Sequence, residues 1–536
     1  MHYLSLAFTP RYIVLTLSML ACAACLLLIK LSLAFVLPAL IAGALVVIGV
    51  GDLVQTRRAI LRNYPIAGHL RFILENVRAE IRQYFFESDI EGTPFSRNKR
   101  AVVYQRAKGQ LDKRPFGTQL DVYAPSFEWL SHSIAPRTPS HQPFRVTVGG
   151  PECAKPYATS LLNISAMSFG SLSANAIRAL NKGARMGQFA HDTGEGGFSP
   201  YHREGGDIIW EIGSGYFGCR NTNGGFSPEA FARTVDDDQI KMVEIKLSQG
   251  AKPGHGGVLP GAKVSAEIAG TRGVPQGVDC ISPPAHSAFS TPLELIAFIG
   301  ELRRLSGGRP VGFKLCIGNA WEFLAICKAM LETGSGPDFI VIDGAEGGTG
   351  AAPLEFVDHI GMPMRDGLMF AHNALVGTNL RQRVRLAASG KIASAFDMAR
   401  ALALGADWCN AARGFMFALG CIQSQSCHTD RCPTGVATQD PVRQRALVVG
   451  DKADRVHNFH RSTIQALAEV IAAAGLESPD QLRPHHIVRR VSHSQIESYD
   501  RLYRFLAPGE LLTGTDDSRF AQAWEAARPD SFAIRA

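Results

Sequence analysis

A repeated pattern between residues 159 and 412 constrains the fold of this chain more than any other feature. Short apolar runs alternate there with glycine-rich or polar loops and with helix-like segments. Because each run is almost wholly apolar, the strands are expected to be buried on both faces, as in a parallel sheet covered by helices. Eight such strands predict an α/β fold, a (β/α)8 TIM barrel. The expected strands are 161–166, 188–191, 243–247, 279–282, 311–316, 339–343, 384–388 and 408–411, and the clearest helices are 173–186, 291–305, 320–333 and 394–404.

Unusual residues follow the predicted strands, at the carboxyl ends where barrel enzymes place their active sites. The last two strands run into AASGK (387–391) and NAARG (410–414), whose small residues allow backbone N–H groups and a helix N-terminus to face a phosphate. These loops predict a ligand that carries phosphate, with simple strand-to-helix turns as the alternative. Lys314, in GFKLCIG, is expected to point into the barrel, where its charge stabilises an anionic ligand or needs another partner.

The stretch VEIKLSQGAKPGHGGVLPGAK (243–263) holds the densest set of chemical groups. Lys246 and Lys252 stand six residues apart around a glycine-proline loop, and Arg272 follows. Together these cations suit a small substrate with more than one carboxylate, although single lysines in loops are usually only solvated. Glu195, in DTGEGG, is a candidate for moving a proton or orienting an amine.

Three cysteines, Cys421, Cys427 and Cys432, stand in CIQSQSCHTDRCP with C-x5-C-x4-C spacing. This spacing allows three thiolates to converge on one inorganic centre and is too irregular for one face of a helix. Three ligands suit an iron–sulfur cluster better than a structural zinc ion, which takes four. Two alternatives stay open at this point: a zinc site completed by His428, and three ordinary buried thiols.

The composition excludes some classes of function. The 11 cysteines are spread thinly over 536 residues, which favours reduced thiols in a cytosolic setting over a secreted disulfide framework. The net charge of +7 is small for this length, and no long Lys/Arg tract occurs, so nucleic-acid binding is not indicated.

Two apolar runs, 12–29 and 31–50, open the chain, with Lys30 between them. Each is about long enough to cross a bilayer as a helix, so they predict an N-terminal transmembrane helical hairpin; a cleaved signal peptide is the alternative. The flanking basic residues place both ends, and the catalytic part, in the cytoplasm, which predicts a multi-pass protein of the inner (cytoplasmic) membrane. Residues 55–150 begin with amphipathic helices near the membrane surface, expected to form a packed collar. The flanking residues are Arg11, Arg57, Arg58, Arg62 and Arg71.

Five runs of sequence follow one another in an order that is far more specific than any one of them. They are SAMSFGSLS (165–173), TGEGG (193–197), KLSQGAKPGHGGVLPG (246–261), DGAEGGTGAAP (343–353) and CIQSQSCHTDRCPTGVATQDP (421–441). Together they resemble the FMN-binding synthase domain of glutamate synthase, over about residues 145–490 and including NFHRS (458–462).

The resemblance implies FMN beside a 3Fe-4S cluster on Cys421, Cys427 and Cys432. In that family electrons pass from the cluster to FMN, and the flavin delivers a hydride to 2-iminoglutarate formed from 2-oxoglutarate and ammonia. It therefore implies an oxidoreductase that makes glutamate, with ferredoxin or another electron donor and with ammonia that is free or comes from a separate amidotransferase subunit. Residue by residue, it implies catalytic roles for Glu195 and Lys246, contacts to the oxo acid from Lys246, Gln249, Lys252 and Arg272, and contacts to FMN from Ala166, Met167, Ser168, Lys314, Gly347, Gly348, Ser389, Gly390, Lys391, Ala412 and Arg413.

The sequence also departs from the family. His255 and Val258 stand where the family usually has glutamate and glutamine, which puts the identity of the substrate in question. A primary amine, giving an N-substituted glutamate, is one alternative; a membrane electron-transfer flavoprotein without substrate chemistry is a second, and a non-redox barrel lyase with structural zinc is a third. Neither the glutaminase domain nor the β-helical domain of the family is expected here.

The predicted organisation has four parts. A two-helix membrane anchor (1–54) precedes a helical and irregular connecting region (55–150). The glutamate-synthase-like barrel (151–490) contains the iron–sulfur loop at 421–432, and an extension (491–536) follows it.

Overall fold

The computed structural model describes residues 11–534. The first ten residues of the predicted anchor and the last two of the predicted extension lie outside the described residues. The chain divides into two compact units, Met1–Gly92 and Thr93–Ala536. Each unit is described by itself below.

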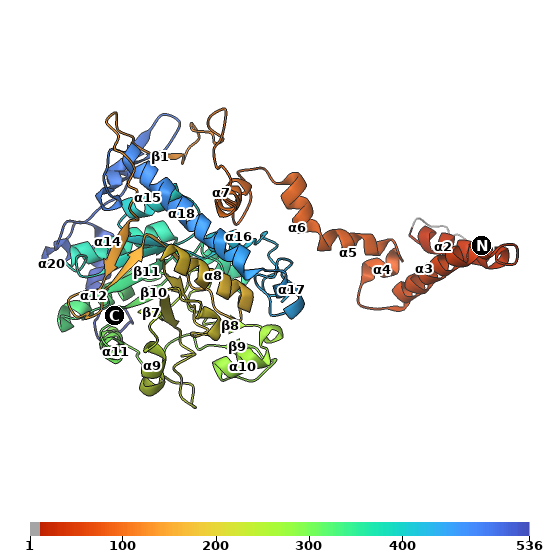
Figure 1. The fold of residues 1–536 in the computed structure, drawn as a ribbon, viewed down its shortest axis with the longest axis horizontal. Coiled ribbons are helices and arrows are strands. Elements are labelled where there is room, and N and C mark those ends of the chain that lie inside the picture. Colours follow the sequence, from red (N-terminus) through yellow and green to blue (C-terminus); the bar gives the residue numbers. More distant parts are fainter. Residues whose placement is uncertain (1–10, 535–536) are drawn as a thin grey trace. The chain divides into compact units, whose positions relative to one another are not determined.

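Eight parallel strands of the second unit close into a barrel, which confirms the predicted fold class (Figure 1). Around the barrel their order is β4-β5-β6-β7-β10-β11-β12-β13. Their bounds are β4 (Leu162–Ile164), β5 (His191–Asp192), β6 (Ile208–Ile212), β7 (Ile240–Lys246), β10 (Val311–Leu315), β11 (Phe339–Asp343), β12 (Arg385–Ser389) and β13 (Trp408–Ala411).

One predicted barrel strand was wrong and another was missed. Residues 279–282 contain only the two-residue strand β9 (Cys280–Ile281), which pairs antiparallel with β8 (Val258–Leu259) outside the barrel. Pro283 and Pro284 come one residue after this strand, and proline cannot donate to a central ladder, so the strand does not continue. The missing barrel strand is β6, whose sequence IIWEI is a short apolar run with one glutamate and was not among the predicted strands.

The predicted helices are confirmed as α8 (Ala174–Gly187), α11 (Pro292–Leu305), α12 (Ala320–Thr333) and α15 (Ala395–Ala403). Local sequence explains their starts, because Ser173, Thr291 and Ser394 accept N-terminal backbone N–H groups as caps. The other helices around the barrel are α9 (Pro228–Val235), α10 (Ala266–Arg272), α13 (Leu354–His359), α14 (Met364–Gly377), α16 (Arg413–Leu419) and α17 (Pro441–Arg445).

A long helix after the cysteine loop, α18 (Val449–Ala473), lies beside α8 although the two are far apart in sequence (Figure 1). Gly183 of α8 permits this close approach, since a Cβ there would lie 2.5 Å from Cγ1 of Val456. Helix α7 (Arg97–Ala107) packs on both α16 and α18. These three helices surround the start of the cysteine loop.

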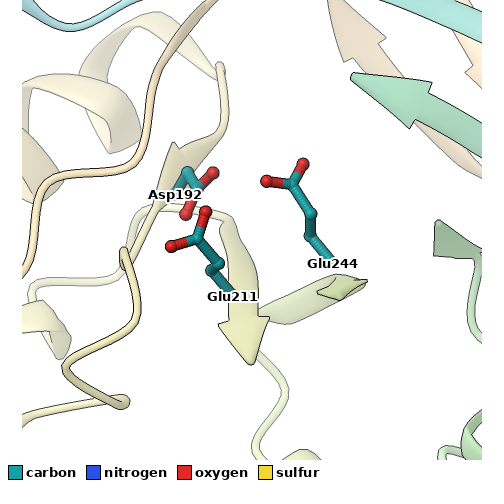
Figure 2. A group of neighbouring side chains, drawn as sticks. All are labelled: Asp192, Glu211 and Glu244. Carbon is teal, nitrogen blue, oxygen red and sulfur yellow. The ribbon is translucent and has the colours of Figure 1, made fainter. Parts of the chain in front are cut away.

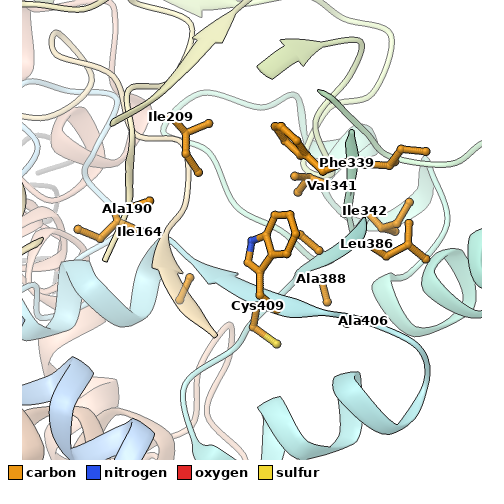
Figure 3. Packing of buried hydrophobic residues seen from close by; sticks show 14 of the residues in the cluster. Ile164, Ala190, Ile209, Phe339, Val341, Ile342, Leu386, Ala388, Ala406 and Cys409 are labelled. Carbon is orange, nitrogen blue, oxygen red and sulfur yellow. The ribbon is translucent and has the colours of Figure 1, made fainter. Parts of the chain in front are cut away.

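The core lies between the strands and the surrounding helices. Figure 3 shows part of it, with side chains from β4, β6, β11, β12 and β13 packed together. Ile164, Phe339 and Trp408 have less than 1% of their surface exposed, as expected for strands covered on both faces. The core therefore holds the strand ends in a rigid ring.

The ends of the second unit pack onto the barrel. The side chain of Glu128, on β1, is 7% exposed and accepts hydrogen bonds from Arg365, Arg400 and Tyr499, so it ties the segment before the barrel to the segment after it. The remaining elements of this unit are β1 (Glu128–Leu130), β2 (Arg145–Val148), β3 (Tyr157–Ser160), β14 (Ile487–Arg490), β15 (Ile496–Ser498), α19 (Tyr499–Leu502), α20 (Glu510–Thr513) and α21 (Ser518–Ala526).

The first unit consists of apolar helices followed by shorter ones. Helix α2 (Ile13–Leu28) packs against α3 (Val36–Val54). Among residues 11–534, one helical stretch, Leu33–Val54 with a mean hydropathy of 2.7, is long and apolar enough to cross a membrane; α2 is apolar but shorter. The expectation that both helices of the pair have spanning length was therefore wrong for α2. The shorter elements are α4 (Ala59–Asn63), α5 (Gly68–Asn76), α6 (Arg78–Ile81) and the π-helical η2 (Arg82–Phe86).

Candidate active site

An ion pair lies where two barrel strands end. Lys246 is the last residue of β7, and its Nζ lies 3.0 Å from Oε2 of Glu195, which follows β5. Burial disfavours the charged form of Glu195, but the ammonium of Lys246, with Arg272 and Lys252 nearby, outweighs it and lowers the pKa of the carboxyl. Gly257 has to lack a side chain, because a Cβ there would lie 2.2 Å from Oε1 of Glu195.

Two further cations, Lys252 and Arg272, face the same carboxylate. The side chain of Lys252 is buried, and its Nζ has no hydrogen-bond partner within the described part of the chain. Burial lowers the pKa of Lys252 to about 8, and repulsion by Lys246 adds to this while Glu195 opposes it. Arg272 ends α10 and is also buried; its Nη2 donates to the carbonyl of Phe169 at 3.0 Å.

The charges at this site do not balance. Lys246, Lys252 and Arg272 carry three positive charges, and Glu195 supplies one negative charge. A buried ammonium without a hydrogen bond is costly unless a ligand completes it. The predicted Gln249 lies half-buried in the same loop, and its carbonyl accepts the N–H of Lys252 at 3.4 Å. The site thus has the charge to bind a small dicarboxylate.

A second group of charges lies deeper in the barrel and was not singled out by the sequence. Figure 2 shows Asp192, Glu211 and Glu244 gathered from β5, β6 and β7, and one carboxylate oxygen of each lies within 4.8 Å of the others. The ammonium of Lys314, on β10, contacts Glu211 directly and lies 3.6 Å from Oε1 of Glu244. Lys314 therefore has a partner for its charge in the barrel interior.

The carboxyl groups of Asp192 and Glu244 tend to retain their protons, because burial and mutual repulsion raise their pKa values. Burial raises the pKa of Asp192 to about 7, helped by Glu211, and burial with Asp192 raises the pKa of Glu244 well above its usual range. Burial disfavours the charged form of Lys314, but the carboxylates around it raise its pKa well above the usual value. Three close carboxylates are a possible metal site by geometry. The ammonium of Lys314 already supplies the cation that they need.

A directional chain of hydrogen bonds holds the backbone of Lys246. Nε2 of His286 lies 2.9 Å from the carbonyl oxygen of Lys246, and since a carbonyl only accepts, Nε2 carries the proton. Nδ1 then accepts from the hydroxyl of Tyr216 at 3.1 Å, and that hydroxyl accepts the N–H of Ala288. Burial lowers the pKa of His286 to about 4, so the ring is neutral. His286 was missed because one histidine in ISPPAHS gives no signal by itself.

The predicted cofactor residues, apart from Lys314, lie at the ends of four neighbouring strands. The barrel order places β11, β12, β13 and β4 side by side. Ala166, Met167 and Ser168 follow β4; Gly347 and Gly348 follow β11; Ser389, Gly390 and Lys391 end β12; and Ala412 and Arg413 follow β13. A Cβ on Gly348 would lie 2.7 Å from Nη2 of Arg413, so the loops after β11 and β13 meet.

Asp343 connects the strand ends that carry the predicted cofactor residues to the site formed by Lys246, Lys252 and Arg272. Its Oδ1 accepts the hydroxyl of Ser389 at 2.7 Å, and its Oδ2 accepts the N–H of Gly250 at 2.9 Å. Gly250 belongs to the loop that carries Lys252. Because one carboxylate binds both loops, the predicted phosphate-binding loop at the end of β12 is held in a fixed position relative to the loop that carries Lys252.

The cysteine loop, 421–432, is held by a helix from before the barrel. The hydroxyl of Tyr104, on α7, donates to the carbonyl of Cys421 at 2.6 Å, and the side chain of Gln423 exchanges hydrogen bonds with the backbone of Phe95. Gln423, Gln425 and Asp430 adopt positive φ, which the irregular path of the loop requires. Sequence reasoning had given residues 55–150 no part in this loop.

The three thiols differ in their surroundings. Burial disfavours the thiolate of Cys432, but the hydroxyl of Thr434 and nearby backbone N–H groups outweigh it and lower its pKa. Burial raises the pKa of Cys421 to about 11. Throughout residues 11–534, the only group of three or more candidate ligands within 4.8 Å of one another is the carboxylate group of the barrel. The three sulfur atoms, with or without His428, are thus spaced more widely than ligands of a single zinc ion.

Residues 147–477 match the family described as "Conserved region in glutamate synthase". This chain belongs to the glutamate synthase family. It is 40% identical over 490 residues to the glutamate synthase large subunit-like protein YerD of Bacillus subtilis (strain 168), with 84% of this chain and 93% of that protein covered. Relatives in the family are named glutamate synthase, so this member is an oxidoreductase enzyme.

Other relatives of the family are longer than the matched region. The archaeal-type glutamate synthase (NADPH) of Thermotoga neapolitana is 36% identical over 326 residues, which cover 60% of each chain. The glutamate synthase (NADPH) large chain of Bacillus subtilis is also 36% identical, but the match covers only 20% of its length. Among solved structures, a flavocytochrome b2 with bound sulfite aligns with a TM-score of 0.41 at 10% identity, over 82% of this chain and 91% of that one, which is too distant to carry an argument.

The hydrogen bond from His286 to Lys246 gives a testable expectation. Replacing His286 by leucine removes the donor, so the affinity for a small dicarboxylate such as 2-oxoglutarate should fall about tenfold, equivalent to about 1.4 kcal/mol. His286→Gln keeps an N–H group near the position of Nε2 and should recover most of the affinity. Titration calorimetry measures both.

His372→Leu is the matched control, since it removes a half-buried histidine whose ring contacts Arg381. It should leave the affinity unchanged. Equal weakening by His286→Gln and His286→Leu would show that the donated hydrogen bond is not what matters.

Proposed function

We propose that this chain is an FMN- and iron–sulfur-dependent oxidoreductase that reductively aminates 2-oxoglutarate to glutamate, through 2-iminoglutarate, using ammonia and an external electron donor. The observation that carries the proposal is the buried ammonium of Lys252, which lacks a hydrogen-bond partner within the described chain and stands beside Lys246, Arg272 and a single carboxylate. Membership of the glutamate synthase family supports it.

The overall reaction is balanced as 2-oxoglutarate, ammonium, two electrons and two protons giving glutamate and water. Lys252 and Arg272 bind the carboxylates, because both are buried cations beside Glu195 and the ammonium of Lys252 has no hydrogen-bond partner among the described residues. Gln249 contributes from the same loop. Glu195 is held ionised by Lys246, so it is suited to orient ammonium and to accept its proton, and Lys246 donates to the oxygen that leaves.

FMN fits the arc formed by the ends of β11, β12, β13 and β4. Its phosphate has donors there, since the backbone N–H groups of Gly390, Lys391 and Arg413 make no hydrogen bond in the described structure. The loop 166–168 and the glycines 347 and 348 complete the arc, and Lys314 would lie on its inner side. When bound, the flavin supplies the hydride for the imine carbon.

The cysteine loop fits a 3Fe-4S cluster on Cys421, Cys427 and Cys432. Three thiol ligands suit a cluster, and Lys263 and Arg413 place positive charge near the thiols. When bound, the cluster supplies single electrons. The donor before it is ferredoxin or another carrier, and ammonia is free or comes from a separate amidotransferase subunit.

The amine alternative has one specific observation in its favour. His255 lies in the loop that closes over Glu195, and its ring packs edge-on against Phe356 with centroids 5.3 Å apart. An aromatic pair offers an apolar surface where the family usually has a carboxylate. A primary amine, giving an N-substituted glutamate, is therefore the second candidate.

The first unit supports a proposal on location. We propose that the apolar helix of residues 33–54 crosses the inner (cytoplasmic) membrane, which its length and hydropathy support, with α2 packed against it. The arginines that follow α3 favour a cytoplasmic position for the catalytic unit.

Anaerobic reduction of the purified holoprotein, followed by mixing with 2-oxoglutarate and ammonium, tests the reaction. We expect the flavin absorbance to return and one glutamate to form per two electrons. Methylamine in place of ammonium separates the two amine candidates, because faster reoxidation with methylamine favours the N-substituted product. A flavin that stays reduced in both mixtures, with no amino acid formed, contradicts the proposal and favours a pure electron carrier.

The pKa of Lys252 predicts a pH dependence. Binding of a dianion needs the ammonium form, which is present below a pKa of about 8 and is lost as the pH rises through it. The affinity for 2-oxoglutarate should therefore be constant near pH 6–7 and fall up to about tenfold per unit above pH 8. In Lys252→Met it should be about 10–100-fold weaker and independent of pH over this range. Lys241→Met, at the other end of β7, is the control; retained pH dependence in Lys252→Met would assign the titration to another group.

The cluster is tested by Cys427→Ser. This variant should lose the three-iron signal in the electron paramagnetic resonance spectrum and most of its iron, while the FMN absorbance stays. Cys153→Ser changes a thiol that donates to a carbonyl outside the loop, and it should keep the signal. Wild-type protein that contains zinc and no iron would overturn the assignment.

A further inference from the structure

The helices after α3 carry an apolar stripe that faces outward. The exposed apolar side chains of α5 recur at helical spacing, and three consecutive exposed aromatic side chains follow in η2; those of Leu70, Phe85 and Phe86 are 61%, 79% and 80% exposed. We call this stripe the α5–η2 surface; its members are Leu70, Ile73, Leu74, Val77, Tyr84, Phe85 and Phe86. The expectation of a packed collar does not hold for these side chains, which are exposed.

The start of this surface is fixed to the last turns of α3. Asp52 is buried in α3, and its carboxylate accepts the N–H of Ile66 at 2.9 Å and lies 2.9 Å from Nε2 of His69. Nε of Arg62 donates to the carbonyl of Leu53 at 3.3 Å. Helix α5 therefore begins at the depth where the apolar helix α3 ends.

The polar residues of the same segment are mainly basic. Residues 55–86 contain six arginines against two glutamates. All six arginines are exposed, and Arg71, Arg78 and Arg82 recur at helical spacing beside the apolar stripe. An exposed apolar stripe bordered by arginine is the pattern of a helix that lies in the headgroup region of an anionic bilayer.

We propose that the α5–η2 surface lies on the lipid bilayer, with its apolar side chains among the acyl chains and its arginines on anionic headgroups. The proposal rests on the membrane insertion of α3 proposed above. The end of α3 sets the depth, the exposed apolar side chains give the surface its affinity for lipid, and the excess of arginine selects anionic lipid over zwitterionic lipid.

Hydrogen–deuterium exchange of the full-length protein tests this in detergent, in phosphatidylcholine nanodiscs and in nanodiscs with 30% phosphatidylglycerol. We expect amides 68–86 to exchange at least fivefold more slowly in the anionic discs than in detergent, with a smaller effect in phosphatidylcholine and a loss of the difference at high salt. The double variant Arg78→Gln, Arg82→Gln should lose the preference for anionic lipid. Phe85→Ser with Phe86→Ser should exchange faster in both discs.

Two internal controls separate the possible outcomes. Arg501→Gln changes an exposed arginine of α19 and should leave exchange at 68–86 unchanged. Protection of amides 36–54 reports insertion of α3. If amides 36–54 are protected but amides 68–86 exchange at the same rate in all three media, the surface proposal alone is overturned. If amides 68–86 are as well protected in detergent as in the discs, protein and not lipid covers the surface, which also overturns the proposal. Absence of protection at 36–54 in the discs overturns the anchor and the surface together.

Discussion

The ammonium of Lys314 inside the barrel is the interaction on which the rest of the site depends. It holds Glu211 and Glu244 from two other strands, with Asp192 beside them, so a single positive charge connects four of the eight strands. Breaking a buried pair of this kind typically costs about 3–5 kcal/mol, because the remaining charge stays buried without a partner and without solvation by water. These buried ion pairs therefore hold the carboxyl ends of the four strands in place.

The barrel contains two layers of charged side chains, one with an excess of carboxylates and one with an excess of cations. Below, three carboxylates surround one ammonium and retain protons, while Oδ2 of Asp192 and both carboxylate oxygens of Glu244 have no hydrogen-bond partner among the described residues. Above, three cations share one carboxylate, and the ammonium of Lys252 has no hydrogen bond within the described residues. Glu244 and Lys246 are two residues apart on β7 and project to the same side, so one strand contributes to both layers. The upper layer therefore has an excess of positive charge that suits an anion, whereas the lower layer is acidic and contains its own ammonium.

The supports of the site come from segments that carry no recognisable motif. Asp343 joins the loop of Lys252 to the end of β12, His286 fixes the carbonyl of Lys246, and Tyr104 from α7 holds the start of the cysteine loop. Each makes a hydrogen bond to backbone, and Asp343 also accepts the side-chain hydroxyl of Ser389. A single aspartate, histidine or tyrosine in the sequence is equally compatible with an ordinary core position, so these roles were not predictable from spacing.

The sequence by itself determined the barrel, seven of its eight strands and the helices with caps, because apolar runs and cap residues are local signals, and its glycine-rich strand ends suggested the candidate site residues. It misjudged the remaining strand: β6 contains Glu211, whose charge is neutralised only by Lys314, about a hundred residues later. It also suggested Lys314 for a ligand, while the tertiary structure pairs it with carboxylates. Burial and partnership of a charge depend on contacts between distant residues, so only the folded chain decided which cations are satisfied and which remain available to bind an anion.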